Sequence, residues 1–281
     1  MLCRNCVRKL SAVASVAFLL MLMACGGGSN SESQMPPPPP PVTIQGQWEL
    51  VAVSTLNPSA PWPNTLIEAT LSQTEGSISA GAQSVALVPF YDKNGEWGVE
   101  NPTMNVCGGS GQTVDGSVTN GTSFAFTLTE SGPNGTYTVS GTATISSDGK
   151  SMTGSYNASA ACGTPDDGGT FSGTLVPSFS GTYTATFSDG STANLTVVED
   201  ANYNLQINGT EQGQAFTLAG EAVGGGFTVT GDVLGSAVTY QGVYLTSQLT
   251  TLIPSVNDIT TATGDFVTVG SDSTIGIVVP N

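Results

Sequence analysis

The sequence has no histidine, and only 9% of its 281 residues are charged. Without an imidazole, the chain cannot use a histidine general base, a Ser-His or Cys-His nucleophile, or a histidine-ligated zinc or iron ion. These absences exclude most hydrolase and metalloenzyme mechanisms. Calcium loops of the Asp-x-Asp-x-Asp-Gly type are also absent, so the sequence predicts no metal site and no cofactor.

Positive charge is scarce. The chain has 5 Lys and Arg against 21 Asp and Glu, a formal net charge of −16. Arg4, Arg8 and Lys9 lie in a segment that we expect to be removed, which leaves Lys93 and Lys150 and a balance of 2 − 21 = −19. A phosphate backbone needs Lys and Arg to displace its counterions, so nucleic-acid binding is excluded.

The carboxylates are the remaining candidates for acid-base chemistry. Asp166-Asp167 lies in a turn-like stretch, and Glu199-Asp200 ends an apolar segment. Glycosidases use two carboxylates that face each other across a cleft, whereas adjacent acidic residues in turns are typical of solvated caps. The sequence therefore predicts no catalytic residues and a protein that is not an enzyme.

Residues 1–24 have the layout of a secretory signal peptide. A basic start is followed by an apolar run over residues 12–24, interrupted by Ser15, and the segment has no acidic residue. A membrane-spanning helix needs roughly 20 apolar residues, and this run is shorter.

The end of this run resembles the lipobox of bacterial lipoproteins, because Ala24 and Cys25 are followed by Gly26 and further small residues. The resemblance implies that Cys25 is lipidated and becomes the first mature residue. Several acyl chains together give stable anchoring. Gly26 stands where an Asp retains such proteins at the inner membrane of well-studied Gram-negative bacteria, so we expect the outer membrane or cell surface.

Residues 25–45 resemble a linker. Gly and Ser come first, and residues 36–41 are six prolines, which favour an extended polyproline II rod. We interpret the segment as a spacer between the membrane and the folded part.

Cysteine usage is consistent with export. Cys3 and Cys6 would leave with the signal peptide and Cys25 would carry lipid, so Cys107 and Cys162 remain. In an oxidising compartment these two are expected to form a disulfide.

From Gly46 onward, apolar residues alternate with Ser and Thr, the period of a strand with one buried face. Phe124, Phe126 and Leu128 fall on one face of such a segment. Asn-Gly and Asp-Gly dipeptides, which supply the positive φ of tight hairpins, separate the segments. The pattern predicts an all-β antiparallel meander that forms one or two up-and-down barrel-like or sandwich units. A single stretch, residues 247–259, leaves helix open.

The meander divides into two expected units, residues 46–179 and 180–281. The second contains an 11-residue repeat, whose segments LQING, FTLAG, FTVTG and VTYQG begin at Leu205, Phe216, Phe227 and Val238. Each repeat ends in a glycine, where a missing Cβ permits a bulge or a sharp bend. The repeat leaves a β-solenoid open as an alternative.

The first unit begins with Gly46-Gln47-Trp48, which resembles the Gly-x-Trp opening of the lipocalin superfamily. The resemblance implies an eight-stranded barrel in which Trp48 closes one end. Other lipocalin signatures, such as the Thr-Asp-Tyr motif and a C-terminal helix, are absent. The alternative is that Trp48 is an ordinary core residue.

Two aromatic loops are candidate ligand contacts. Trp62 lies between two prolines, and Tyr91 and Trp97 lie in a long insertion. They could form a barrel mouth that binds a small apolar or carbohydrate ligand, or they could simply cover the barrel end. The sequence thus supports a lipid-anchored ligand-binding barrel, with a surface structural or adhesion protein that has filled interiors as the alternative. The two differ in cavity volume.

Overall fold

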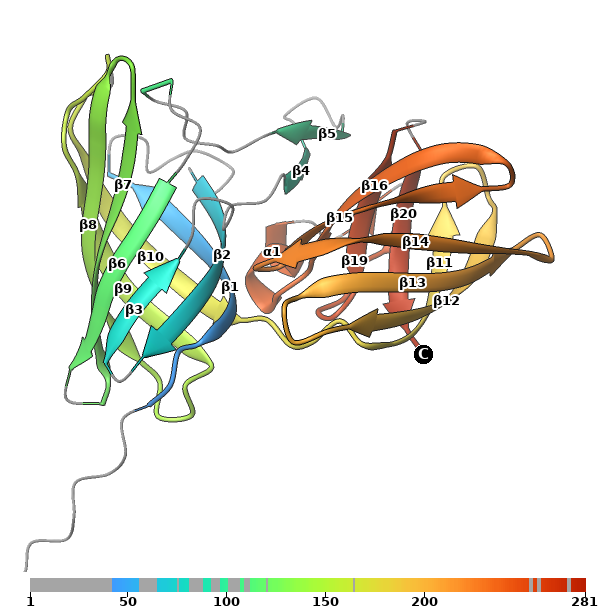
Figure 1. Cartoon of the computed structure of the whole chain (residues 1–281), viewed down its shortest axis with the longest axis horizontal. Helices are drawn as coiled ribbons and strands as arrows, with labels where there is room; N and C mark the ends of the chain where they lie inside the picture. The colour runs from blue at the N-terminus through green and yellow to red at the C-terminus, as the bar shows by residue number, and fades with distance from the viewer. Residues whose placement is uncertain are drawn as a thin grey trace, which may run out of the picture. The chain divides into compact units, whose positions relative to one another are not determined.

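Two closed eight-stranded antiparallel barrels follow one another along the chain (Figure 1). The structure is a computed structural model that describes residues 42–55, 65–74, 76–80, 88–91, 97–100, 107–108, 112–119, 121–163, 165–252, 255–256, 259–271 and 274–281. The predicted lipidation site Cys25 and the loop residue Trp62 lie outside these ranges. The all-β prediction is confirmed, since the described residues contain one short helix, α1 (Ser247–Leu252).

The first barrel has the strand order β1-β10-β9-β8-β7-β6-β3-β2. Its strands are β1 (Gly46–Ser54), β2 (Thr65–Thr74), β3 (Ser77–Ala80), β6 (Gln112–Thr119), β7 (Ser123–Gly132), β8 (Gly135–Ile145), β9 (Ser151–Ala158) and β10 (Asp167–Leu175). A separate hairpin, β4 (Val88–Tyr91) and β5 (Trp97–Glu100), is inserted between β3 and β6.

The second barrel has the order β11-β12-β13-β14-β15-β16-β19-β20. Its strands are β11 (Gly181–Phe187), β12 (Thr192–Glu199), β13 (Asn204–Glu211), β14 (Gln214–Val223), β15 (Gly226–Val233), β16 (Ser236–Tyr244), β19 (Phe266–Gly270) and β20 (Ile275–Pro280). Helix α1 and the small hairpin β17 (Ser255–Val256) and β18 (Ile259–Thr260) lie between β16 and β19. Within the described part of the chain, no helix has the length and apolar character needed to cross a membrane.

Both sheets are closed, and this distinguishes the fold from the sandwich and the solenoid that the sequence leaves open. Strand β1 pairs with both β2 and β10, and β11 pairs with both β12 and β20, always antiparallel. The 11-residue repeats form β13 to β16 as consecutive antiparallel hairpins. These pairings exclude a sandwich and a solenoid for these strands, and they leave neither barrel with an open edge.

The turns and faces follow the sequence pattern. Gly121, Gly149 and Gly190 adopt φ angles of 73°, 71° and 84° in the connections between strands, as their Asn-Gly and Asp-Gly dipeptides predict. Phe124 and Leu128 are buried inside the first barrel, and the alternating Ser and Thr residues face outward.

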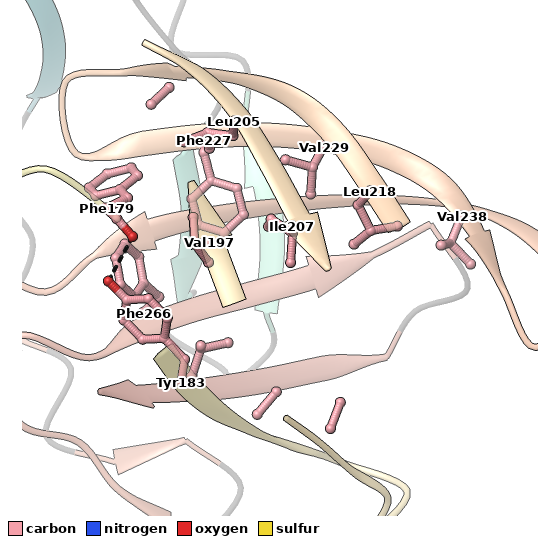
Figure 2. Packing of buried hydrophobic residues seen from close by; sticks show 14 of the residues in the cluster. Phe179, Tyr183, Val197, Leu205, Ile207, Leu218, Phe227, Val229, Val238 and Phe266 are labelled. Atoms are coloured by element: carbon pink, nitrogen blue, oxygen red, sulfur yellow. Dashed lines mark hydrogen bonds between the residues drawn. The ribbon is translucent and has the colours of Figure 1, made fainter. Parts of the chain in front are cut away.

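The two barrels begin in the same way. The Trp48 indole nitrogen donates a hydrogen bond to the Ile44 carbonyl at 2.8 Å, and the Tyr183 hydroxyl donates to the Phe179 carbonyl at 2.8 Å (Figure 2). In both cases the aromatic residue lies four positions after the carbonyl. Each bond satisfies a buried polar atom at a barrel end, so both Gly-x-aromatic segments serve the same structural purpose.

These contacts extend each barrel beyond its predicted start. Ile44, within the predicted linker, is fully buried in the first barrel. Phe179, the last residue of the first predicted unit, packs in the core of the second barrel (Figure 2). A segment that closes a barrel end therefore precedes the first strand in both cases.

The repeat glycines make room on the inner face instead of forming bulges, since the strand registers run without interruption. A Cβ at Gly209 would lie 2.2 Å from the ring of Phe216, and one at Gly242 would lie 2.3 Å from the ring of Phe227. At Gly220 the Cβ would meet the Thr228 carbonyl oxygen at 1.9 Å, so here the glycine permits the close backbone approach of a bent strand.

The disulfide that the cysteine count predicts is present. Cys107 and Cys162 are joined, with Cα atoms 5.1 Å apart and a sequence separation of 55. Cys107 is fully buried and belongs to a small cluster with Leu128, Tyr137 and Val139. The bridge therefore ties the end of the insertion to the wall of the first barrel.

Candidate functional site

The predicted ligand-contact residues are only partly located. Tyr91 and Trp97 are cross-strand partners in the β4–β5 hairpin, for which the backbone alone is described. Trp62 lies outside the described residues. The structure thus pairs two of the three residues across the strands of one hairpin, and this hairpin is not part of either barrel wall.

The barrel interiors are the first place to look for a ligand site. The first barrel contains a cavity of about 100 Å³ and the second a cavity of about 60 Å³. Pockets for drug-sized ligands usually have volumes of roughly 300 to 1,000 Å³. Both interiors are therefore largely filled by side chains.

Aromatic side chains fill the second barrel (Figure 2). Phe266 lies 4.9 Å from Phe179, 5.6 Å from Tyr183 and 5.8 Å from Phe227, measured between ring centroids, and all three pairs are edge to face. Such geometry is favourable for aromatic rings and leaves little free space. Its cavity wall is almost wholly apolar.

Both cavities have polar residues in their walls, Glu211 and Thr268 in the second barrel and Tyr156 and Asp167 in the first. In the first barrel, Asp167 accepts hydrogen bonds from the Ser54 hydroxyl at 2.7 Å and the Tyr156 hydroxyl at 3.1 Å. Burial, followed by the hydrogen bond and charge of Asp167, raises the pKa of Tyr156 to about 12. The phenol is therefore neutral at physiological pH and donates to the carboxylate. An apolar cavity with one polar end suits a small molecule that carries a hydroxyl or amine group.

Of the other acidic residues weighed in the sequence, Asp166 and Asp200 cap local turns. Asp166 accepts a hydrogen bond from the Ala160 N–H. Asp200 is exposed, and hydrogen bonds from the Asn204 side chain and then from the backbone of Asn204 and Asn202 lower its pKa. These two roles agree with the interpretation as caps. Glu199 instead makes a tertiary contact, because it accepts a hydrogen bond from the Phe179 N–H before β11.

Two buried glutamates form the most unusual polar cluster of the described residues. Glu49 on β1 and Glu68 on β2 are cross-strand partners on the outer face of the first barrel, and they are 1% and 0% exposed. The Thr246 hydroxyl donates to Glu49 Oε1, and the Gly225 N–H donates to Glu68 Oε2. Both donors belong to the second half of the chain, and residues 39–281 form one compact unit.

Burial dominates the electrostatics of this pair. It raises the pKa of Glu49 from 4.5 to about 8, with the Thr246 hydrogen bond acting in the opposite direction. Burial, and then the charge of Glu49, also raise the pKa of Glu68 well above its usual value. The hydrogen bond from Gly225 lowers this pKa. The remaining oxygens, Glu49 Oε2 and Glu68 Oε1, are buried without a hydrogen-bond partner.

Sequence reasoning missed this pair. A signal was nevertheless present, because Glu49 shares the outward face of β1 with Gln47 and Val51, which the structure also buries. An apolar residue at an outward position of a strand indicates that something covers that face. Metal binding needs more ligands than this pair supplies, and no group of three or more Cys, Asp or Glu residues that could hold an ion occurs in the described ranges.

Comparisons with known proteins add no further constraint: neither the family models nor the curated proteins give a match to this chain.

Proposed function

We propose that the chain is an exported lipoprotein of the bacterial cell envelope. The basic start, the apolar run over residues 12–24 and Cys25 support a lipidated N-terminus, and the prolines of residues 36–41 support a spacer. The membrane is then the partner of the N-terminus, through acyl chains on Cys25. The two barrels are held beyond the spacer, at the outer membrane or cell surface.

The barrels themselves act as filled, non-enzymatic structural or adhesion modules that interact through their outer faces. The observation that carries this proposal is cavity volume: about 100 Å³ and 60 Å³ are too little for a fatty acid, a sterol or an oligosaccharide. Large inward side chains such as Phe126 and Phe266 occupy the space that a lipocalin-like carrier would keep free.

A second candidate function is the binding of a small ligand in the first barrel. The hydrogen-bonded group of Ser54, Tyr156 and Asp167 at one part of the cavity favours it. A molecule of a few heavy atoms with a hydroxyl or amine would fit this chemistry.

A thermal-shift screen separates the two functions. Fatty acids, sterols and oligosaccharides are expected to leave the melting temperature unchanged, because neither barrel can admit them. A binder at 100 times its Kd would stabilise the protein by about 2.7 kcal/mol, which is a shift of several degrees. A shift with any of these ligands contradicts the filled-barrel proposal. A shift with small alcohols or amines that Asp167→Asn abolishes favours the second function.

The anchor has its own test. Cys25→Ser removes the thiol that would carry lipid, so metabolic labelling with an alkynyl fatty acid is expected to mark the wild type and not the variant. The variant should also appear in the soluble fraction. Cys3→Ser is the matched control and should be labelled like the wild type. Equal labelling of Cys25→Ser and the wild type contradicts the lipoprotein proposal.

A further inference from the structure

Glu49 and Glu68 lie where an ionised pair is most unfavourable. Their Cα atoms are paired across β1 and β2, and both side chains are buried. Like charges directly opposite each other destabilise a pair of strands, and removal from water adds a much larger cost. Two ionised carboxylates at this position therefore need compensation by positive charge or by protons.

The residues that cover the pair supply hydrogen-bond donors without charge. Gly225, in the turn between β14 and β15, donates its N–H, and Thr246, before α1, donates its hydroxyl. A Cβ on Gly225 would lie 2.9 Å from Glu49 Oε2 and 3.3 Å from Glu68 Oε1. The two oxygens that lack a partner thus face the same small space beside Gly225. A proton on either carboxyl group would give this space the donor that it lacks.

Positive charge is not available from the described part of the chain. Its single cationic side chain is Lys150, which is exposed in the turn before β9. The neighbouring elements carry titratable groups at Tyr240 and Tyr244 on β16, Asp265 before β19, the exposed Glu221 on β14, Asp232 on β15 and Asp167 on β10. Burial, and then the charge of Glu49, raise the pKa of Tyr244, so this phenol is neutral. The Asp265 carboxylate accepts a bond from the Ala262 N–H at 2.7 Å.

We propose that Glu49 and Glu68 form a proton-dependent latch between the two barrels, which holds them together while the pair is protonated and loosens their contact as the pair ionises. Among the described residues, the other hydrogen bonds of this contact join neutral groups. Gln47 donates to the Ala222 carbonyl at 3.0 Å and accepts from the Gly224 N–H at 2.6 Å, and Gln248 donates to the Ser172 hydroxyl. The pH dependence is therefore assigned to the two glutamates.

The direction of the pH dependence follows from linkage. Carboxyl groups released into water regain a pKa near 4.5, whereas burial holds the pKa of Glu49 at about 8 and that of Glu68 well above its usual value. Between pH 4.5 and about 8, closing the contact between the barrels therefore takes up protons. The contact is strongest below pH 4.5 and weakens as the pH rises toward about 8, by up to about tenfold per pH unit for each proton.

Small-angle X-ray scattering tests the latch on the full chain carrying Cys25→Ser, which avoids lipid. The radius of gyration is expected to increase as the pH rises from 4.5 to about 8 and above, because the barrels separate. The double variant Glu49→Gln with Glu68→Gln keeps the shape of both side chains without a titrating group, so its radius should not change with pH. Glu221→Gln removes an exposed carboxylate from β14 and should respond like the Cys25→Ser chain.

Several results would overturn the proposal. One is a radius of gyration of the Cys25→Ser chain that does not change from about pH 5 to 9.5. Another is a double glutamine variant whose radius of gyration changes with pH in the same way as that of the Cys25→Ser chain. A chain that opens with EDTA at neutral pH and closes with calcium would show that a cation, not a proton, compensates the pair. Carboxyl ¹³C resonances give a readout that needs no variant: Glu49 should titrate near pH 8 and Glu68 well above its usual range, and titration of all glutamates near pH 4.5 contradicts the latch.

Gly224→Ala opens the contact without a change in charge. Gly224 has a φ angle of 60°, and its Cβ would lie 2.6 Å from the Trp48 carbonyl oxygen and 2.6 Å from the Ala69 backbone nitrogen, so the radius of gyration should be large at every pH while circular dichroism retains the sheet signal of both barrels. A compact, pH-responsive Gly224→Ala chain would contradict the assigned position of the latch.

Discussion

Trp48→Ala is expected to lower the free energy of unfolding of the first barrel by about 3 to 5 kcal/mol, as for other large-to-small substitutions of buried aromatic residues. Trp48 is 0% exposed and is among the largest fully buried side chains of the described residues. Its loss leaves a cavity at the end of the barrel and removes the donor that satisfies the Ile44 carbonyl. Urea denaturation followed by circular dichroism measures the effect.

Trp48→Phe is the matched control for this prediction. It keeps an aromatic ring in the barrel and removes the indole N–H, so it should cost clearly less than the alanine variant. The second barrel does not contain Trp48, and its unfolding transition should stay where it is in the wild type. A loss below about 1 kcal/mol for Trp48→Ala would contradict the position of this ring as the closure of the barrel.

Removal of the disulfide is the second change with a large expected effect. Replacing both Cys107 and Cys162 with alanine should lower the stability of the first barrel by about 4 kcal/mol on the chain-entropy model, because the bridge closes a loop with a sequence separation of 55. The measurement is the urea midpoint of the oxidised wild type against that of the double variant.

Reduction gives the control for the disulfide. Dithiothreitol should lower the midpoint of the wild type toward that of the double variant, and it should leave the double variant unchanged. Thiol counting on the unfolded, unreduced Cys25→Ser chain should detect no free thiol at positions 107 and 162. A midpoint that does not respond to reduction would show that the bridge contributes nothing to stability.

Much of the fold could be predicted from the sequence, because it depends on interactions between residues close together in the chain. The alternation around Phe124 and the turn glycines such as Gly149 act within one strand or one hairpin, where neighbours in sequence are neighbours in space. The 11-residue repeat predicts hairpins of equal length for the same reason. The disulfide was predictable because the expected export of the chain and lipidation of Cys25 would leave a single pair of cysteines.

Features that depend on contacts between distant parts of the chain could not be predicted in this way. The pairing of β1 with β10 closes the first barrel, yet nothing local to either strand identifies its partner. Cavity volume also depends on how all inward side chains fit together, so the sequence could name Phe126 and Leu128 as residues of one face without showing that the interior is nearly full.

The sequence by itself determined the β character of this protein, the direction in which each strand residue points, the positions of the turns and the scarcity of positive charge. The tertiary structure alone decided closure, filling and the burial of Glu49 and Glu68. The alternating pattern records whether a residue faces into or out of its own sheet. Whether an outward residue is then buried depends on a surface such as Gly225, which lies 157 residues after Glu68, and strand periodicity carries no information across that distance.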